Sequence, residues 1–438
     1  MRGTMQTAHG AVIREEASAV APSVAIPGFI KRNTCYLAAA QACVGIGNQM
    51  MPTLGALMVV HLTGTEALAG AATAILGGCR LLSAYPTGYV TDAYGRKAGL
   101  FLGLLLCFLG SLVIGLAMIG LSAATFFLGV VVFGLGVGAV QQLRLAAADM
   151  YPPHRRAEGL GYVLTGSLIG AMGGPVLISI AQGNASRLGI DPSALAWLLV
   201  PVLLLPTAGL VFLVRPDPKE IAAHLERYYP GLTRRPTPRA AQASGSLISF
   251  LRYYPRLVAF VTSTAVYGNM TTMMAMNAIA LSHHGHGLPA ISLSVAIHIT
   301  GMFGLSLPLG RLADRVGRRN VMLLGIVNAA IGGCLVALAA EYWVVTLGTF
   351  LAGFGWSCNN VASVALIADT TGPAERGRAV GTNDTLNGMA SISLPLLAGP
   401  LITIAGLGSL AVLSVGLMVV PLVLLLRLRE TSPGRYAY

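Results

Sequence analysis

The sequence predicts an all-α membrane protein in which twelve transmembrane helices form two pseudo-symmetric six-helix bundles. The first observation behind this fold class is composition. Of the 438 residues, 55% are hydrophobic and 10% are charged, whereas soluble domains carry about 25% charged residues. The second observation is a series of long apolar runs, and the third is a repeat between the two halves of the chain.

Apolar runs long enough to cross a bilayer recur along the whole chain. A hydrocarbon core about 30 Å thick needs about 20 mostly apolar residues per helix. The runs do not alternate apolar and polar residues as the strands of a membrane barrel do, so they predict helices. Twelve runs are found, at residues 34–62, 66–90, 98–119, 122–148, 157–181, 194–214, 253–281, 289–312, 319–340, 342–368, 377–404 and 406–427.

A polar, proline-rich and basic segment at residues 215–252 separates the first six runs from the last six. The sequence therefore predicts bundles at residues 34–214 and 253–428, joined by a cytoplasmic loop at 215–252. The tails are residues 1–33 and 429–438. The first tail has no compact apolar core followed by a cleavage site of small residues, so we expect it not to be a secretory signal.

The net charge of +12 predicts membrane topology rather than nucleic-acid binding. All Lys and Arg residues except Arg80, Arg144 and Arg187 fall in the tails or in loops on one side of the predicted membrane. Loops rich in Lys and Arg stay in the cytoplasm. We therefore expect a multi-pass protein of the bacterial inner membrane with both termini cytoplasmic. Basic loops also attract anionic lipid headgroups, which makes the lipid bilayer the expected partner.

The two halves of the chain repeat in sequence. GYVTDAYGRKAGL at 88–100 returns as GRLADRVGRRNVM at 310–322, an offset of 222 residues. The matched positions are Gly88, Asp92, Gly95, Arg96 and Lys97, and then Gly310, Asp314, Gly317, Arg318 and Arg319. A second repeat matches Asp149, Arg156 and Gly161 with Asp369, Arg376 and Gly381. Such duplication is typical of transporters whose halves rock about a site near the membrane midplane.

The motif G-x-x-x-D-x-x-G-R-[KR], present twice, resembles the signature of the major facilitator superfamily, and the resemblance covers the whole chain. It implies the fold of that superfamily, alternating access, and control of the conformational cycle by the two loops. We expect Asp92 and Asp314 to accept backbone N–H groups and to pair with guanidinium groups across the seam between the halves. Ala93 replaces a residue that is often basic in the family.

The fifth run contains a second motif, GYVLTGSLIGAMGGP. Its glycines and proline fit g-x8-G-x3-G-P, which resembles the antiporter motif of drug exporters in this superfamily, at Gly161, Gly170, Gly174 and Pro175. The usual closing Gly-Gly is absent. Glycines at this spacing also permit close helix packing in any membrane protein, so a packing or hinge role stands beside antiport.

Residues 270–302 contain five methionines and four histidines. Met270 and Met274 form an M-x-x-x-M pair on one predicted helix, and His298 and Met302 form an H-x-x-x-M pair on the next. Residues four apart share a helix face, and thioether and imidazole groups together suit Cu(I). Methionine alone is a common gap-filler in apolar cores, whereas a histidine inside a membrane helix indicates a functional site.

These two pairs, with Met274 and His298 separated by 24 positions, closely resemble the pattern of the CcoA-like branch (CalT family) of the superfamily. That branch contains bacterial copper importers, alongside relatives that carry riboflavin and lack the motifs. The resemblance implies copper, as an ion or a chelate, as the transported ligand, with no cofactor and with the protein acting as a monomer. It implies copper ligands at Met270, Met274, His298 and Met302.

Other polar residues give further candidates. His283, His284 and His286 lie in an expected outer loop, where they form either a metal-capture site or an ordinary polar loop. Asp384 lies inside a predicted helix, where a charge costs at least about 2.5 kcal/mol unless it is paired or hydrated. It predicts either a proton-coupling group or a salt bridge to a cytoplasmic arginine. Arg80 and Arg144 also lie inside predicted helices, and Asp149 is an expected partner for Arg144. On the first run, the candidates to face a central cavity are Asn48, Gln49, Met50 and Met51.

Two functions from the transporter class therefore compete, and a third comes from another class. A copper importer explains the Met and His pairs, whereas a proton-coupled multidrug or small-metabolite exporter explains the motif of the fifth run. A membrane sensor is disfavoured because the chain has no sizeable soluble output domain. An enzyme is not expected, since no nucleophile–base arrangement, P-loop or HExxH motif is present.

Overall fold

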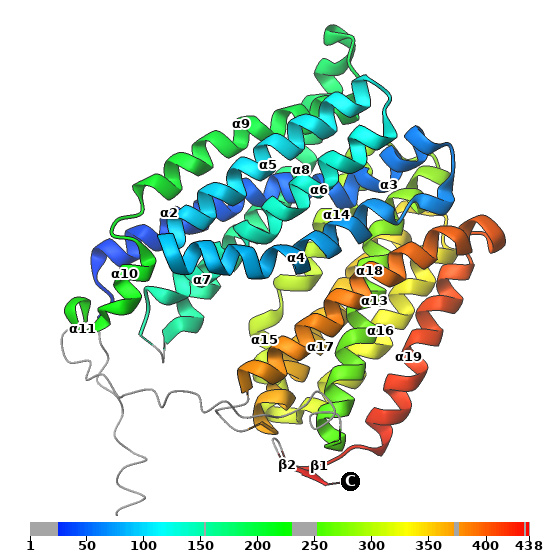
Figure 1. Ribbon diagram of the computed structural model, residues 1–438. Helices are drawn as coiled ribbons and strands as arrows, with labels where there is room; N and C mark the ends of the chain where they lie inside the picture. The colour runs from blue at the N-terminus through cyan, green and yellow to red at the C-terminus, as the bar shows by residue number, and fades with distance from the viewer. Residues whose placement is uncertain (1–24, 153–154, 230–251, 372–375, 433–434, 438) are drawn as a thin grey trace, which may run out of the picture.

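The computed structural model describes residues 25–152, 155–229, 252–371, 376–432 and 435–437 (Figure 1). The first half contains α2 (Gly28–Asn48), α3 (Met50–Thr63), η1 (Glu66–Leu68), α4 (Ala71–Tyr94), α5 (Arg96–Ile119), α6 (Ala123–Val140), α7 (Gln142–Asp149), α8 (Arg156–Leu188) and α9 (Pro192–Leu213). Two short helices follow, α10 (Pro218–Ala223) and α11 (Leu225–Tyr228). The second half contains α13 (Tyr254–His283), α14 (Leu288–Phe303), α15 (Ser306–Val316), α16 (Arg318–Leu338), α17 (Tyr342–Asp369), α18 (Arg376–Ala405) and α19 (Ser409–Arg427). An antiparallel hairpin ends the chain, β1 (Arg429–Ser432) with β2 (Arg435–Ala437).

Membrane-spanning helices dominate the described residues. Nine of their helices are long and apolar enough to cross a membrane, or ten if the bent pair α14–α15 counts as one span. Helices α4 and α13 have 24 and 30 residues and carry more polar side chains. Both line the cavity described below, which accounts for their lower apolar content. With α2–α3 and α6–α7 each taken as one broken span, the helices match the twelve predicted runs.

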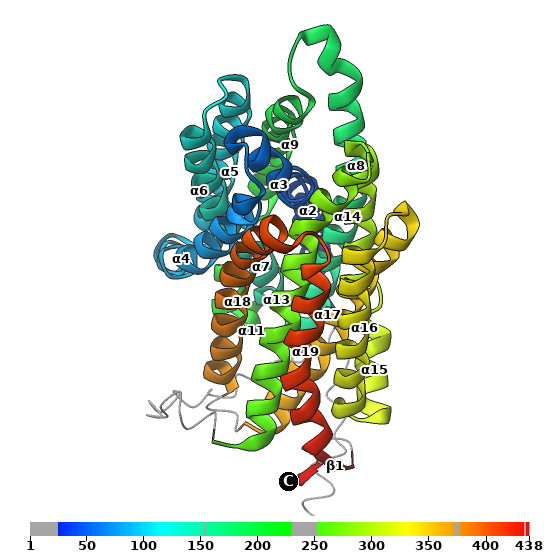
Figure 2. The ribbon, with the colours of Figure 1, turned by 90° about the vertical axis from the view of Figure 1, so that its right-hand side faces the viewer.

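The helices form two bundles that pack internally in the same way (Figures 1 and 2). In the first half, Gly110 of α5 lies against the Phe133 backbone of α6, and in the second Gly332 of α16 lies against Gly348 of α17. Without side chains at these glycines, the helix backbones approach closely, and close approach is a main source of helix association in membranes. Each half also has its own core of buried apolar side chains.

The two halves touch at one end of the molecule and separate at the other. We call the end with α10, α11 and β1 the linker end, and the end with η1 and the α13–α14 turn the distal end (Figure 1). At the distal end, Gly70 of α4 packs on the Pro395 carbonyl of α18, and Gly399 packs on the η1 backbone. Towards the linker end, a Cβ atom at Gly88 of α4 or Gly381 of α18 would meet nothing within 4 Å. The structure is therefore closed at the distal end and open towards the linker end.

The first signature loop is held by two carboxylates from its own half. Gly95 has a φ of +98°, a conformation that suits glycine, and it lets α5 begin directly after α4. Asp217 accepts hydrogen bonds from the backbone amides of Arg96 and Lys97, both at 3.1 Å. The Arg96 guanidinium donates to Asp149 at 2.8 Å. The Asp217 carboxylate therefore places a negative charge at the positive, N-terminal end of the α5 dipole.

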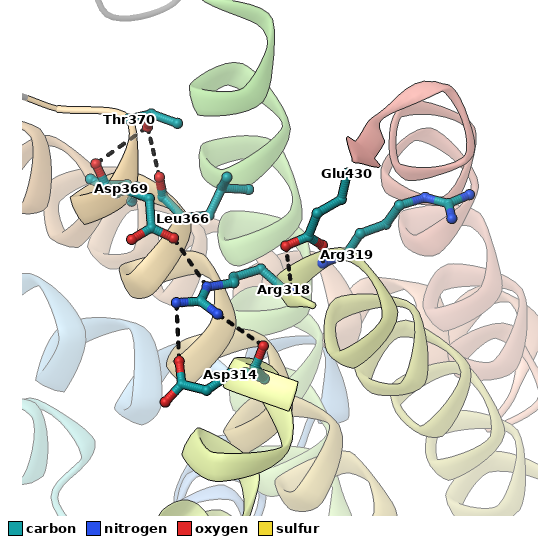
Figure 3. A network of polar contacts seen from close by, with 9 residues as sticks. Asp314, Arg318, Arg319, Leu366, Asp369, Thr370 and Glu430 are labelled. Atoms are coloured by element: carbon teal, nitrogen blue, oxygen red, sulfur yellow. Dashed lines mark hydrogen bonds and ion pairs between the residues drawn. The ribbon is translucent and has the colours of Figure 1, made fainter. Parts of the chain in front are cut away.

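The second signature loop repeats this arrangement (Figure 3). Glu430 of β1 accepts hydrogen bonds from the backbone amides of Arg318 and Arg319, at 3.0 and 2.9 Å. The Arg318 guanidinium lies 3.0 Å from Asp369 and 3.0 Å from Asp314. The sequence repeat thus corresponds to a repeated network of charges in the two halves.

Three expectations about these loops and their partners are corrected by the structure. The amides at the start of α16 bind Glu430 rather than Asp314, because the chain returns to this helix end after α19. The Arg318 ion pairs lie inside the second half rather than across the seam, since Asp314 is one helical turn away and Asp369 ends the neighbouring α17. Arg96, not Arg144, is the observed partner of Asp149. The side chains of Asp92, Arg156 and Arg376 lie outside the described part of the structure.

Candidate substrate cavity

A cavity of about 260 Å³ lies between the two halves. A second cavity of about 550 Å³ adjoins it and shares part of its wall, including Arg80 and Tyr267. Helices α2, α3, α4, α7 and α8 supply the wall from the first half, and α13, α14 and α17 supply the wall from the second. A site between two pseudo-symmetric halves is where a rocking transporter binds its cargo.

One face of α13 supplies much of the second-half wall. Tyr267, Met270, Thr271 and Met274 all line the cavity, and their spacing of three, four and seven residues places them on one side of a helix. Met270 is almost completely buried, whereas Met274 is partly exposed to the cavity. The M-x-x-x-M pair predicted from sequence therefore faces the cavity.

The H-x-x-x-M pair on α14 divides between the cavity and the helix behind it. Met302 lines the cavity with Met270 and Met274. His298, one turn earlier, is 1% exposed and lies against α17, where its Nδ1 is 2.6 Å from the Thr349 carbonyl. A carbonyl only accepts hydrogen bonds, so Nδ1 carries the proton. The Nε2 atom is then a buried acceptor, and it has no partner among the described residues.

The first-half wall is polar and positively charged. Of the candidates on the first run, Asn48, Gln49 and Met51 line the cavity, whereas Met50 is buried in the first-half core. Arg80 of α4 and Arg144 of α7 line it as well. Several polar atoms of this wall are buried and make no hydrogen bond to a described residue, namely Gln41 Oε1, Gln49 Nε2, Ser167 Oγ, Arg80 Nε and Arg144 Nε.

An aromatic group on the second-half wall was not identified from the sequence. The Trp356 ring lies 6.2 Å from Tyr267 and 5.7 Å from Phe303, and all three residues line the cavity. Tyr267 lies three residues before Met270, so helical spacing alone could have placed it on the same face as the methionine pair. No local sequence pattern indicates Trp356, because only the packing of α17 brings this residue to the cavity.

Asp384 lines the second cavity together with Arg80. Its side chain is exposed, and it makes no ion pair within 4 Å to any residue that the structure describes. Among the described residues, the salt bridge that the sequence offered as an alternative is not formed. A carboxylate that faces a cavity can exchange protons with water that enters that cavity.

The antiporter-like motif of α8 lies against α2 and the seam. Gly170 packs on the backbone of Gly45, and Gly174 lies where a side chain would meet Gln49 and Ser292. A Cβ atom at Gly161 would meet nothing within 4 Å, and Pro175 lies inside the helix. Two of the four motif residues thus serve close packing between helices.

The three histidines of the α13–α14 turn have different neighbours. His283 contacts Glu66 of the first half, with Nε2 2.5 Å from Oε1. The His286 ring lies 5.3 Å from the Tyr342 ring, and His284 is exposed. In the part of the chain that the structure describes, no three His, Cys, Asp or Glu side chains are grouped to hold a metal ion. This arrangement does not favour a capture site here.

Most of this chain is similar in sequence to a family of known proteins. Its sequence matches the family model of the Major Facilitator Superfamily over residues 37–268 and 258–437. The chain belongs to the Major Facilitator Superfamily. It is therefore a multi-pass membrane transporter rather than an enzyme, and members of this superfamily generally need no cofactor.

Two relatives in the superfamily cover nearly the whole chain. The uncharacterized MFS-type transporter YdeG of Bacillus subtilis (strain 168) is 27% identical over 400 residues, which cover 90% of this chain and 91% of the relative. Riboflavin transporter RfnT of Brucella anthropi is 26% identical over 405 residues, which cover 91% of this chain and 96% of the relative.

Solved structures support the same fold for this superfamily member. The nucleoside transporter NupG has a TM-score of 0.64 at 16% identity, over 91% of this chain and 98% of that one. A bacterial homolog of the human lysosomal transporter Spinster, in an inward-facing and occupied conformation, has a TM-score of 0.65 at 13% identity, over 92% and 96%. At these identities the likeness concerns the fold alone.

Proposed function

We propose that this protein imports copper across the bacterial inner membrane by alternating access, with the metal as its cargo. The supporting observation is the hydrogen bonding of the two ring nitrogens of His298. Its Nδ1–H donates to the Thr349 carbonyl, which leaves a buried Nε2 lone pair without a partner among the described residues. Metal-binding histidines typically donate their other ring N–H to a carbonyl or carboxylate in this way, which fixes the tautomer and the ring orientation.

The residues around this histidine suit a soft metal ion. Met270, Met274 and Met302 line one cavity, and Met302 is one helical turn from His298. Thioether and imidazole ligands select Cu(I), whereas Mg²⁺ and Ca²⁺ require carboxylate and carbonyl oxygens. No carboxylate lines this cavity within the described residues. The proposed ligands of the cargo are therefore Met270, Met274, Met302 and His298.

The proposed orientation rests on the distribution of basic residues. The Lys and Arg residues gather at the linker end, and the positive-inside rule assigns that end to the cytoplasm, together with both termini. The structure is then an inward-open state that is closed at the distal end. Labelling of a Lys219→Cys variant on α10 by an impermeant maleimide tests the orientation. Labelling only after the membrane is permeabilised agrees with it, and labelling of intact cells contradicts it.

Proton coupling and a monomeric unit complete the proposal. One chain supplies both halves of the cavity, so a single copy contains a whole transport site. Asp384 is exposed, faces the second cavity and has no ion-pair partner among the described residues. It is our proposed proton carrier, because a carboxylate that gains and loses a proton during the cycle can link transport to a pH gradient.

A second candidate function is transport of an aromatic metabolite or drug. The aromatic group of Tyr267, Phe303 and Trp356 on the cavity wall favours it, since flat aromatic ligands stack on such rings. The relative RfnT is named a riboflavin transporter. The α8 motif, which resembles that of drug exporters, adds the outward direction as part of this alternative.

Uptake of radiolabelled copper by cells that lack or express the protein distinguishes the two functions. We expect expression to raise copper uptake, and His298→Ala to return it to background at equal protein abundance in the membrane. An excess of unlabelled riboflavin should leave copper uptake unchanged. Copper uptake that is the same with and without the protein, together with uptake of labelled riboflavin, would replace the copper function by the second candidate.

A further inference from the structure

The cavity has two chemically different walls, and only one of them suits copper. The second-half wall carries the thioethers of Met270, Met274 and Met302. The first-half wall carries Arg80 and Arg144, with amide and hydroxyl groups around them. A soft metal ion uses the first set of groups and has no use for the second.

Arg80 and Arg144 have no partner among the described residues that explains their presence. The Nε atoms of Arg80 and Arg144 are buried and make no hydrogen bond, and neither side chain forms an ion pair within the described residues. The nearest carboxylate on the cavity walls is that of Asp384, in the adjoining cavity, and it lies beyond ion-pair distance. Unpaired charges inside a membrane protein are expensive and mark the path or site of a ligand.

Charge also argues against a bare metal ion as the cargo. Methionine and neutral histidine bring no negative charge, so a Cu⁺ ion bound to them keeps its positive charge. Two guanidinium groups on the same cavity then repel that ion, in surroundings where water screens charges poorly. An anion bound with the metal removes the repulsion, and guanidinium groups bind carboxylates through paired, charge-assisted hydrogen bonds.

We infer that the cargo enters as an anionic complex of Cu(I) with a small carboxylate-bearing chelator. The thioethers of α13 and α14 face the metal, and Arg80 and Arg144 bind the carboxylates. This inference rests on the proposed copper function and adds the chemical class of the transported species. Gln49 Nε2 and Ser167 Oγ are also buried and make no hydrogen bond within the described part of the chain, so they provide further donors to the same anion.

Uptake by reconstituted vesicles, with copper supplied in three forms, tests the inference. The forms are Cu(I)–glutathione, Cu(I) with a glutathione whose two carboxylates are esterified, and the cationic Cu(I)–acetonitrile complex. We expect the first to enter about tenfold faster than the other two, as the loss of charge-assisted hydrogen bonds implies. Copper and glutathione carry separate labels. Entry of both labels identifies the chelate as the cargo, whereas entry of the copper label alone shows that glutathione does not travel with the metal.

Variants test which residues recognise the anion. Arg80→Gln and Arg144→Gln should remove the preference for Cu(I)–glutathione, and Arg80→Lys should restore part of it because it keeps the charge. Arg187→Gln is the matched control, since Arg187 is exposed at the end of α8, outside the cavity. Elution as a single peak in size-exclusion chromatography shows that each variant is folded.

The outcomes separate the inference from the function on which it rests. Equal uptake of all three forms by the wild-type protein, or an unchanged preference in both glutamine variants, overturns the inference and leaves copper import in place. Entry of labelled copper without labelled glutathione overturns the inference that the cargo is a chelate. Uptake of no form of copper by the wild-type protein overturns the copper function itself.

Discussion

His283 Nε2 lies 2.5 Å from Glu66 Oε1, and this contact joins the two halves of the molecule at the distal end. His283 is the last residue of α13, and Glu66 lies in η1 between α3 and α4. Gly399 packs on the backbone of the same η1 turn. The contact and the tight glycine packing together close the distal side while the linker side is open.

We predict that Glu66→Gln makes the distal side open more often. An exposed ion pair contributes about 0–1 kcal/mol, so the open population should rise by up to about fivefold. Ser292 is buried at the seam, and a Ser292→Cys substitution can report opening through labelling of intact cells by an impermeant maleimide. Asp191→Asn is the matched control, because Asp191 caps α9 and does not contact the other half. Equal labelling of the two variants would show that the ion pair does not close this side.

We predict that Asp369→Asn slows transport more than Asp314→Asn does. Both carboxylates lie 3.0 Å from Arg318, but the Asp314 side chain is 71% exposed and the Asp369 side chain 28%. Water screens the more exposed pair, so its loss costs less. The network is distant from the cavity, so ligand affinity should stay near wild type in both variants. Initial uptake rates measured beside equilibrium binding check this, and a loss of affinity with an unchanged rate would contradict it.

The sequence predicted the features that depend on local pattern. Runs of about 20 apolar residues located the helices, and the repeated GR[KR] loops located the two halves. The spacing of Met270 and Met274 correctly placed both on one face of α13. These properties follow from helix geometry and the bilayer, so they can be derived without knowing which helices touch.

The sequence could not predict contacts set by packing between distant helices. Asp217 reaches the start of α5 from a position 121 residues away, and no local pattern indicates that pairing. Arg144 looked like a partner for Asp149, but packing gives Asp149 to Arg96 and leaves Arg144 at the cavity. The Thr349 carbonyl that accepts the His298 Nδ1–H comes from α17, 51 residues further along the chain. In each case the packing of distant helices decides which of the possible partners a side chain contacts.

We predict that Asp384→Asn uncouples uptake from the pH gradient. The asparagine side chain has nearly the same shape but cannot carry a proton, so a gradient imposed on reconstituted vesicles should no longer accelerate uptake. Ligand binding should persist, because Asp384 lies in the adjoining cavity rather than beside the methionines. Thr385→Ala is the control, since Thr385 lines the same cavity and does not titrate. Acceleration by the gradient that equals wild type would exclude Asp384 as the proton carrier.

The sharpest prediction compares two methionines of α13 that differ only in their surroundings. Met274 lines the cavity, whereas Met276 is completely buried in an apolar cluster. Replacing either with leucine conserves volume and apolarity and costs under about 1.5 kcal/mol of stability. If Met274 ligates the cargo, Met274→Leu should abolish copper uptake, because the remaining ligands leave the ion under-coordinated. Met276→Leu should transport copper normally.

His298→Gln extends the same test to the imidazole. Glutamine can still donate a hydrogen bond to the Thr349 carbonyl, so a purely structural role should survive the change, whereas a metal ligand should not. We therefore expect copper uptake to be lost while protein abundance in the membrane stays near wild type. Normal copper uptake in both Met274→Leu and His298→Gln would refute the copper function. The aromatic group around Trp356 would then become the part of the cavity to examine, with a metabolite or drug as cargo.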